Sequence, residues 1–399
     1  MAKESVFIII DFVTKHKHFH NPAIIEKYSQ IIQNSGFRLN IILPAYADRL
    51  AFNDTVGDKL FMLYSLQNGP DFKDNPLLHV LFRISEFLIA KSIMGSRFKQ
   101  LLRTLLIQKV FKFIKRTFLH DSGAINVLFP SPDPLSVELA KKLSENKTET
   151  TINFLFRIIG GESRGALASN LELETINKIA KKHNNRVKIG YETEGYLNYL
   201  TKNHFDANMI YWTPWPQFTV KKISKNIGQK MNIGFMGAAK TRKGFDLIPD
   251  ILNEIQKNNI DFMAYIQGAV APWEGYEFTL KKLYSFSSEH YVLLSGSLQL
   301  NEFQEIISKL DAIILPYSPK SYSINASGIV YHACDANVPI LTFHGVGFAQ
   351  ELKNYNLGFL FQDIKEIPGL LHKVQKKKNY DFSRYNSDRN RATFKFLFE

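Results

Sequence analysis

The short loop between Gly237 and Gly244 carries three cationic side chains, Lys240, Arg242 and Lys243. Glycine lets a ligand come close to the backbone, and clustered cations neutralise negative charge. An apolar run predicted to be a strand precedes the loop and a predicted helix follows it, so the helix N-terminus adds unpaired N–H groups. The loop is therefore a predicted phosphate site. It is not a Walker A loop, because it lacks the GxxxxGK[ST] pattern.

A second candidate anion site lies within residues 311–361. An apolar strand (312–315), a proline turn and a Ser- and Gly-containing loop lead into a helix that begins near Gly328, and an apolar strand (339–342) follows. A loop that opens a helix above a sheet edge presents backbone N–H groups to an anion. An ordinary strand–helix–strand unit of an α/β sheet is the alternative interpretation.

Polar side chains also occupy predicted loops in the first half of the chain, and such loops line the cleft of an open α/β sheet. A carboxylate and a guanidinium on adjacent loops suit a polyhydroxylated or charged acceptor, although each charge taken singly could be a solvated loop residue. Arg157 directly follows an apolar strand, so a partner must orient it. The candidate acceptor-binding residues are His20, Asp133, Arg157 and Glu162.

Alternating histidines at positions 16, 18 and 20 are the one hint of a metal site. No carboxylate or cysteine flanks them at ligand spacing, so a polar loop at a cleft rim is the favoured interpretation. We expect neither a metal nor a cofactor.

The 399 residues are enough for two α/β domains, because repeated strand–helix units run through both halves. The first loop, residues 14–21, lacks the dinucleotide fingerprint GxGxxG. Residues 208–230 contain two prolines, aromatic residues and a basic run, which is typical of a linker. The predicted domains are therefore residues 1–219 and 220–399.

A basic amphipathic helical insertion is predicted at about residues 84–120. No acidic residue occurs between Glu86 and Asp121, whereas apolar residues recur there at three- and four-residue spacing. Such a helix can lie on an anionic membrane, or it can pack on its domain with a solvated basic face. Nucleic-acid binding is disfavoured, because no compact recognition motif is present.

The net charge of the chain favours an anionic partner, and its cysteine content favours a reducing compartment. The formal charge is +13, and Cys334 is the only cysteine, which excludes a disulfide framework. No stretch approaches the roughly 20 apolar residues of a spanning helix. The N-terminal apolar run is short and ends near Asp11, which favours a first strand over a signal peptide. A cytoplasmic location is expected.

The order of segments from Gly237 to Phe361 resembles the C-terminal half of retaining glycosyltransferases of family 4. The resemblance rests on the G-x5-KG loop, on SGIVYHACDANVPIL and on GVGFAQELKNYNLGFLF, and covers about 150 residues well. It implies the GT-B fold, an α/β architecture with two Rossmann-like α/β/α domains facing each other across a cleft. The first domain would bind the acceptor and the second a nucleotide-sugar donor, and the last helix can cross back to the first domain.

The resemblance also assigns donor residues. Lys243 occupies the position of the lysine that contacts the donor phosphates, and Lys240 or Arg242 can replace a basic residue that is absent at Ala238. Ser327 and Gly328 match the segment whose amides meet the β-phosphate. The implied catalytic residues are Lys243, Arg242 and Asn325, and the implied donor-binding residues are Gly237, Lys240, Gly244, Gly296, Tyr317, Ser327, Gly328 and His332.

The Glu-x7-Glu motif of that family is replaced here by Ile324 and His332. A histidine can bond a ribose hydroxyl, whereas isoleucine cannot contact the sugar through a hydrogen bond, so Asn325 or Ser323 would take that part. Donor identity stays open for this reason.

The predicted function is transfer of a sugar from a nucleoside-diphosphate donor to a glycan or lipid-linked acceptor, with retention of configuration and no metal. The Lys-, Asn-, Ile- and Phe-rich composition is compatible with an AT-rich bacterial genome and hence with surface polysaccharide assembly at the inner membrane face. The alternatives are an inverting GT-B enzyme with Asp133 or His20 as base, a nucleotide-sugar epimerase, a non-catalytic nucleotide-sugar or glycan-binding protein, and a nucleic-acid binder.

Overall fold

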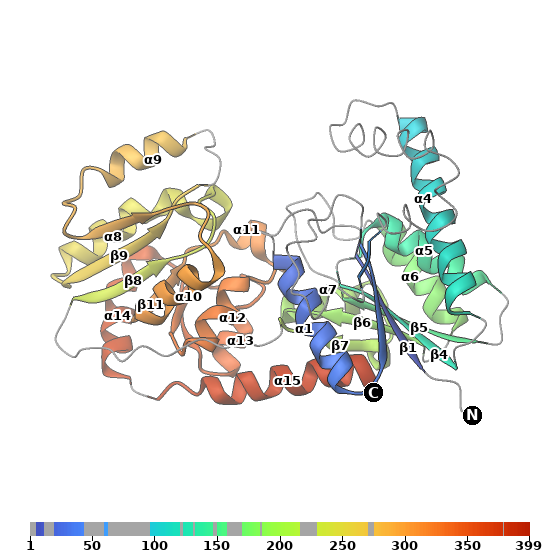
Figure 1. Cartoon of the computed structure of the whole chain (residues 1–399). Helices are drawn as coiled ribbons and strands as arrows, with labels where there is room; N and C mark the ends of the chain where they lie inside the picture. Colours follow the sequence, from blue (N-terminus) through green and yellow to red (C-terminus); the bar gives the residue numbers. More distant parts are fainter. Residues whose placement is uncertain are drawn as a thin grey trace.

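The protein, described here from a computed structural model, consists of two lobes side by side, each built around a parallel β-sheet (Figure 1). The structure describes residues 5–11, 20–43, 60–62, 96–119, 123–130, 132–146, 150–157, 170–183, 186–215, 230–269, 275–377 and 379–399. The predicted boundary near residue 220 lies outside these ranges.

The first lobe holds a seven-stranded sheet in the order β3-β2-β1-β4-β5-β6-β7. Its strands are β1 (Val6–Ile10), β2 (Arg38–Leu43), β3 (Leu60–Met62), β4 (Ala124–Phe129), β5 (Thr151–Arg157), β6 (Val187–Tyr191) and β7 (Ile210–Trp212). Its helices are α1 (His20–Asn34), α4 (Ser96–Thr117), α5 (Pro134–Glu145), α6 (Asn170–Lys182) and α7 (Glu194–Lys202), with a 3-10 turn at Ala207–Met209.

Both faces of this sheet are covered, which is why β1 is apolar throughout. Phe7 and Ile9 pack on the side of α1, whereas Val6, Ile8 and Ile10 pack with residues of α4, α5 and α6. All five side chains are buried, as expected for a central parallel strand.

The second lobe holds a six-stranded parallel sheet in the order β10-β9-β8-β11-β12-β13. Its strands are β8 (Met231–Phe235), β9 (Phe262–Gln267), β10 (Tyr291–Leu294), β11 (Ala312–Leu315), β12 (Ile340–Phe343) and β13 (Gly358–Phe361). Its helices are α8 (Ile248–Lys257), α9 (Tyr276–Leu283), α10 (Leu300–Lys309), α11 (Pro319–Tyr322), α12 (Gly328–Asp335), α13 (Ala349–Asn354) and α14 (Ile367–Lys376), with 3-10 turns at Thr241–Lys243, Phe245–Leu247 and Ile364–Glu366.

This strand order is that of the dinucleotide-binding doubly wound fold, and it reverses between β8 and β11. In such sheets ligands bind at that reversal, outside the carboxyl ends of the strands. The Lys243 loop follows β8, and the loop before α12 follows β11. The topology therefore places both predicted phosphate-binding segments at the carboxyl ends of β8 and β11, where the strand order reverses.

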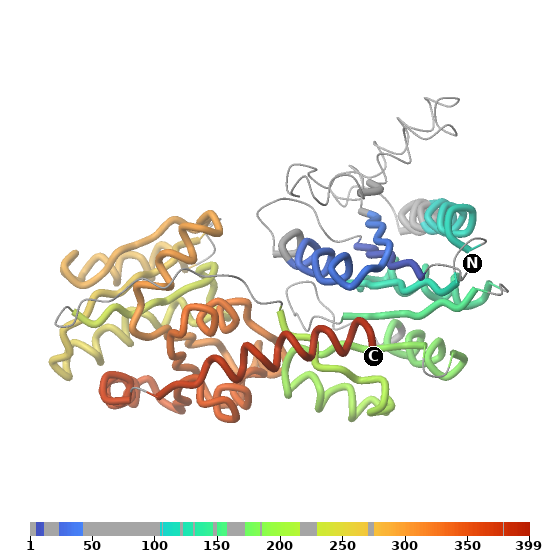
Figure 2. Tube along the Cα trace, turned by 60° about the horizontal axis from the view of Figure 1, so that its bottom comes forward, coloured from blue at the N-terminus to red at the C-terminus, as the bar shows by residue number. Residues whose placement is uncertain are grey.

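The last helix, α15 (Phe382–Phe398), runs from the second lobe along the first lobe (Figures 1 and 2). Lys188 of β6 donates to the Phe396 carbonyl at 3.0 Å. The ring of Phe398 stacks on Phe37 and meets Phe7 edge-on. One apolar core thus continues from the first lobe through α15 into the second.

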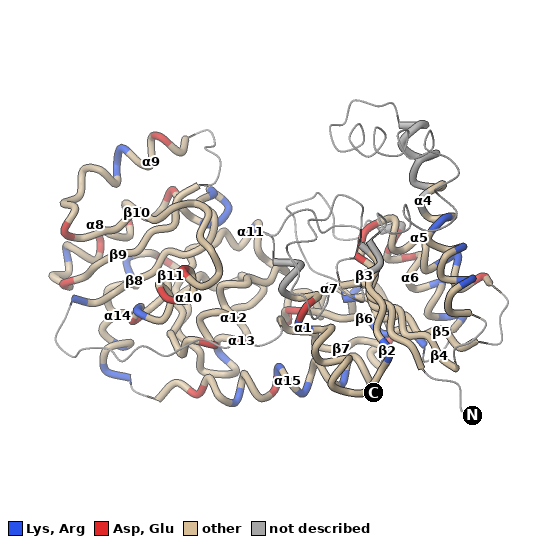
Figure 3. Tube along the Cα trace, viewed as in Figure 1, with Lys and Arg blue, Asp and Glu red and all other residues tan. Residues whose placement is uncertain are grey.

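Helix α4 is the described part of the predicted insertion, whose residues 84–95 lie outside the described ranges. Part of its apolar stripe, at Ile107, Val110 and Ile114, is buried in the first lobe and packs on the domain, whereas Leu105 is 41% exposed. Three exposed cations on its other side form what we call the α4 basic face (Figure 3): Lys112, Lys115 and Arg116. Among the described helices, none is long and apolar enough to cross a bilayer.

Candidate functional site

The Lys243 loop is held against the segment that follows β11. Gly244 has φ +73°, and a Cβ there would overlap the Pro316 carbonyl oxygen and lie 2.8 Å from its carbon. Ser318 donates its N–H to the Arg242 carbonyl at 3.1 Å. Only glycine suits position 244, because both the left-handed backbone and the close approach exclude a side chain. The loop therefore bridges the two strands at the topological reversal.

The ammonium of Lys243 points back across the end of β8. A Cβ placed on Gly237 would lie 3.0 Å from Lys243 Nζ and 3.3 Å from Tyr317 Oη. Lys243 Nζ also lies 5.4 Å from the centroid of the Tyr317 ring. Burial, and secondarily the charge of Arg242, lowers the pKa of Lys243. None of the ion pairs between described residues includes Lys243, so a partly desolvated cation faces this point.

The other two cations of the loop are less enclosed. Lys240 is exposed, and burial together with the charges of Arg242 and Lys243 lowers its pKa. The guanidinium of Arg242 is half-buried and lies 5.8 Å from the Tyr322 ring centroid. The three like charges are therefore coupled, and an anion would relieve their repulsion.

The N-terminus of α12 also lies beside Gly237 and Tyr317, the residues that the Lys243 ammonium approaches. Tyr317 Oη and Ser327 Oγ share a hydrogen bond of 3.2 Å, and the Ser327 side chain does not cap the helix. The Cβ position of Gly237 lies 3.6 Å from a side-chain carbon of Ile329, in the first turn of α12. Uncapped first-turn N–H groups thus lie beside the lysine, an arrangement that suits an anion.

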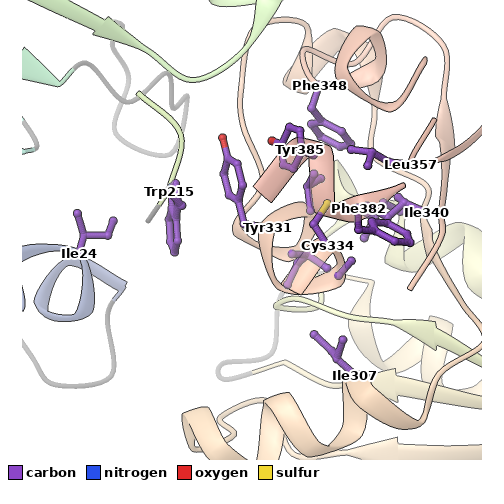
Figure 4. Packing of buried hydrophobic residues seen from close by; sticks show 14 of the residues in the cluster. Ile24, Trp215, Ile307, Tyr331, Cys334, Ile340, Phe348, Leu357, Phe382 and Tyr385 are labelled. Carbon is purple, nitrogen blue, oxygen red and sulfur yellow. The ribbon is translucent and has the colours of Figure 1, made fainter. Parts of the chain in front are cut away.

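Trp215, which follows β7 of the first lobe, covers the start of α12. A Cβ on Gly328 would lie 3.2 Å from its ring, and the ring stacks on Tyr331 at 6.0 Å (Figure 4). Arg389 of α15 donates to the Trp215 carbonyl at 3.2 Å and forms a buried ion pair with Asp335. The helix that holds the candidate anion site is therefore braced from the first lobe and from α15.

Gln267, at the end of β9, is a site residue that sequence reasoning missed. Its side-chain oxygen accepts the Gly237 N–H at 2.7 Å, and its side-chain nitrogen donates to the Gly296 carbonyl at 3.2 Å. The sequence signal that could have identified it is a glutamine at the end of an otherwise mostly apolar strand, β9. Gln267 joins Gly237 and Gly296, two of the predicted donor residues.

Asn325 and His332 are both buried, the first in the loop before α12 and the second within α12. Asn325 donates from Nδ2 to the Ser321 carbonyl at 2.9 Å. His332 packs edge-on against Phe303 of α10 with 5.2 Å between ring centroids. The structure places them as elements of the loop and the helix, and their predicted roles toward a donor stay predictions.

The predicted acceptor residues that the structure describes come at or after the ends of β1, β4 and β5, which are neighbouring strands of the first sheet. Asp133 caps α5, because its carboxylate accepts from the Ser136 N–H at 2.9 Å and from its hydroxyl at 2.6 Å. Arg157 is fully buried at the end of β5 and pairs with Glu192, which is the orienting partner expected for it. His20 begins α1, and Glu162 lies outside the described residues.

A separate cavity of about 250 Å³ lies where both lobes and α15 meet. It is lined by Tyr191, Glu194, Trp212, Glu351, Asn354, Tyr355, Arg384 and Asp388, and by none of the predicted donor residues. Glu351 is 5% exposed, and burial raises the pKa of its carboxyl to about 8. In the described part of the chain, no cluster of three or more His, Cys, Asp or Glu side chains could hold a metal ion.

Comparison by sequence finds no matching family model and no matching curated protein. Comparison by structure finds many. The apo form of WaaB, a lipopolysaccharide outer core galactosyltransferase, superposes with a TM-score of 0.63 at 13% identity, over 98% of this chain and 97% of that one. The chain has the GT-B fold.

Two further similar structures contain ligands. HepE from Anabaena, in complex with UDP and glucose, has a TM-score of 0.60 at 11% identity, with 98% of this chain and 96% of that chain covered. A variant of TarM from S. aureus, in complex with Fondaparinux, alpha-GlcNAc-glycerol and UDP, has a TM-score of 0.60 at 11% identity, with 99% and 97% covered. The similarity spans both lobes of the GT-B fold.

Proposed function

We propose that the protein is a glycosyltransferase that moves a sugar from a nucleoside-diphosphate donor to a glycan or lipid-linked acceptor. The observation that carries the proposal is the convergence of Lys243 Nζ, Tyr317 Oη and the uncapped start of α12 at the reversal of the second sheet. A diphosphate would offset the desolvation of Lys243 and accept hydrogen bonds at the N-terminus of α12, which the Ser327 side chain does not cap.

In the proposed reaction the bond between the anomeric carbon and the diphosphate oxygen breaks, and the electron pair leaves with the diphosphate. Lys243, Arg242 and the α12 amides stabilise the charge that develops there. The acceptor hydroxyl attacks the anomeric carbon from the same face, and its proton passes to the departing phosphate oxygen. Configuration is retained, and the scheme needs neither a protein nucleophile nor a metal.

The proposed setting is bacterial surface polysaccharide assembly at the inner face of the cytoplasmic membrane. The α4 basic face supports it, because each Lys or Arg near an anionic surface adds about 1 kcal/mol of attraction. The similarity to a lipopolysaccharide galactosyltransferase points in the same direction.

A thermal-shift screen with UDP-, GDP-, ADP- and CMP-sugars tests the proposal and identifies the base. We expect one of the UDP-, GDP- or ADP-sugar classes, and not the CMP-sugars, which carry a monophosphate, to raise the melting temperature and then to support release of free nucleotide with an acceptor extract. Absence of any shift across all four classes at millimolar concentration would contradict the donor site.

A non-catalytic nucleotide-sugar-binding protein is the second candidate. It is favoured by Ile324 and His332, because the resembled family carries glutamates at both positions. Binding without hydrolysis or transfer in the same screen would select this candidate.

A further inference from the structure

A turn of the first lobe packs directly on the loop that leads into α12. We call residues 192–195, which follow β6 and include the first two residues of α7, the α7 turn, and residues 323–328, which end at the first residue of α12, the donor loop. Thr193 Oγ1 donates to the Ile324 carbonyl at 2.6 Å, and the Glu194 N–H donates to Glu351 Oε1 at 3.0 Å. Both bonds join the two lobes.

At Gly195 and at Gly347, the backbone lies too close to the donor loop to leave room for a side chain. A Cβ on Gly195 would overlap the Ser323 carbonyl oxygen and lie 3.1 Å from the Ile324 Cα. A Cβ on Gly347 would lie 2.7 Å from the Ile324 carbonyl carbon. These neighbours are backbone atoms, so they cannot rotate away as a side-chain tip could.

The donor loop is therefore enclosed from both sides. The Gly347 N–H donates to the Tyr322 carbonyl at 2.6 Å, just before the loop, and the α7 turn closes the other side. The loop carries Asn325 and Ser327, and the Ser327 hydroxyl bonds Tyr317. A shift of the α7 turn would be transmitted to the residues beside Lys243.

We propose that the α7 turn is a positioning element of the donor site, with Thr193 and Gly195 as its positioning residues. The first lobe would hold the donor loop in the conformation that presents Asn325 and the N-terminus of α12. Since coupling free energies are reciprocal, a nucleotide that binds the ordered loop would strengthen the contact between the lobes by the same factor. This inference rests on the proposed function only in taking the donor loop as part of a nucleotide site.

The first test compares Gly195→Ala with Gly369→Ala. Each glycine lies in the first turn of a helix, α7 and α14, but a Cβ on Gly369 meets nothing within 4 Å. Hydrogen–deuterium exchange needs no nucleotide, so it tests the lobe contact even if the proposed function is wrong. We expect faster exchange in residues 323–328 in Gly195→Ala and no change there in Gly369→Ala. Unchanged exchange in Gly195→Ala would overturn the proposal.

The second test measures binding of UDP, GDP and ADP by calorimetry. For whichever binds the wild type, Gly195→Ala should weaken affinity by about ten- to a hundred-fold, since small displacements of a site cost this much. Equal affinity in a folded variant would contradict positioning. If none of the three binds the wild type, the exchange result still decides whether the α7 turn orders the loop.

A third pair covers the case in which Gly195→Ala does not fold. Thr193→Val removes the hydroxyl, which donates to the Ile324 carbonyl and also caps α7 by accepting the Tyr196 N–H at 3.2 Å, whereas Thr193→Ser keeps both bonds. We expect faster exchange of the donor loop in the valine variant and recovery to wild-type exchange in the serine variant. Identical exchange in the two variants would show that the hydroxyl bond does not hold the loop.

Discussion

Replacing Lys243 with methionine should lower activity and stabilise the protein at the same time. Methionine retains much of the apolar stem and removes the charge. A lysine whose folded-state pKa is lowered destabilises the fold while it is charged, that is, at pH values below its folded pKa. At pH 7 the neutral variant should therefore have the higher free energy of unfolding, since burial and the charge of Arg242 no longer act on an ammonium.

The loss of activity follows from the charge facing the diphosphate. Two unit charges about 4 Å apart interact by about 4 kcal/mol at an effective dielectric constant of about 20, which corresponds to about a thousand-fold in rate. Arg242 and the start of α12 remain, so we expect kcat/KM to fall by about 10²- to 10³-fold.

The assay pairs steady-state kinetics with urea denaturation of the same preparations. Lys281→Met, at an exposed position of α9 in the same lobe, is the control and should change neither quantity appreciably. Wild-type turnover in Lys243→Met would refute the phosphate assignment. A clear loss of stability would show that Lys243 is held by a favourable interaction and refute the electrostatic reasoning.

Three further outcomes are expected. Gly244→Ala, which places a Cβ on the Pro316 carbonyl, should lower the free energy of unfolding by more than about 2 kcal/mol in urea denaturation; a loss below 0.5 kcal/mol would contradict the close approach. Burial raises the pKa of Glu351 to about 8, so the folded state retains a proton that the unfolded chain releases above its ordinary pKa; between pH 6 and 9 the wild type should lose about 3 kcal/mol more stability than Glu351→Gln, and parallel pH profiles would count against this. Changing the α4 basic face to glutamine should release the protein from anionic vesicles in sedimentation, whereas unchanged binding would leave the face without a membrane role.

The two-lobed architecture could be predicted from sequence because its signals are local. Buried strands such as β1 are short apolar runs, and helices such as α8 repeat apolar residues at the helical period. The Lys243 loop could also be predicted to bind an anion, because two glycines and three cations lie within eight consecutive residues.

Contacts between distant segments could not be predicted. Arg157 was expected to have a partner, but the identity of Glu192, 35 residues later, depends on β5 and β6 being neighbours. The contact between Gly195 and the Ser323 carbonyl depends on how two lobes meet, and nothing local to either residue indicates it. The amphipathic pattern of α4 predicted a helix correctly but could not decide which surface its apolar stripe covers.

The contact of Phe398 with Phe7 and Phe37 bears on how the molecule folds and how it can be divided. Closing a chain segment of this length costs about 5 kcal/mol of loop entropy by the logarithmic rule. The contact is thus expected late in folding, after each sheet has formed from nearer neighbours. A fragment that ended after β7 would leave the rings of Phe7 and Phe37 uncovered and prone to aggregation. Any attempt to express the first lobe separately should therefore supply α15 as well, for example by joining it through a linker.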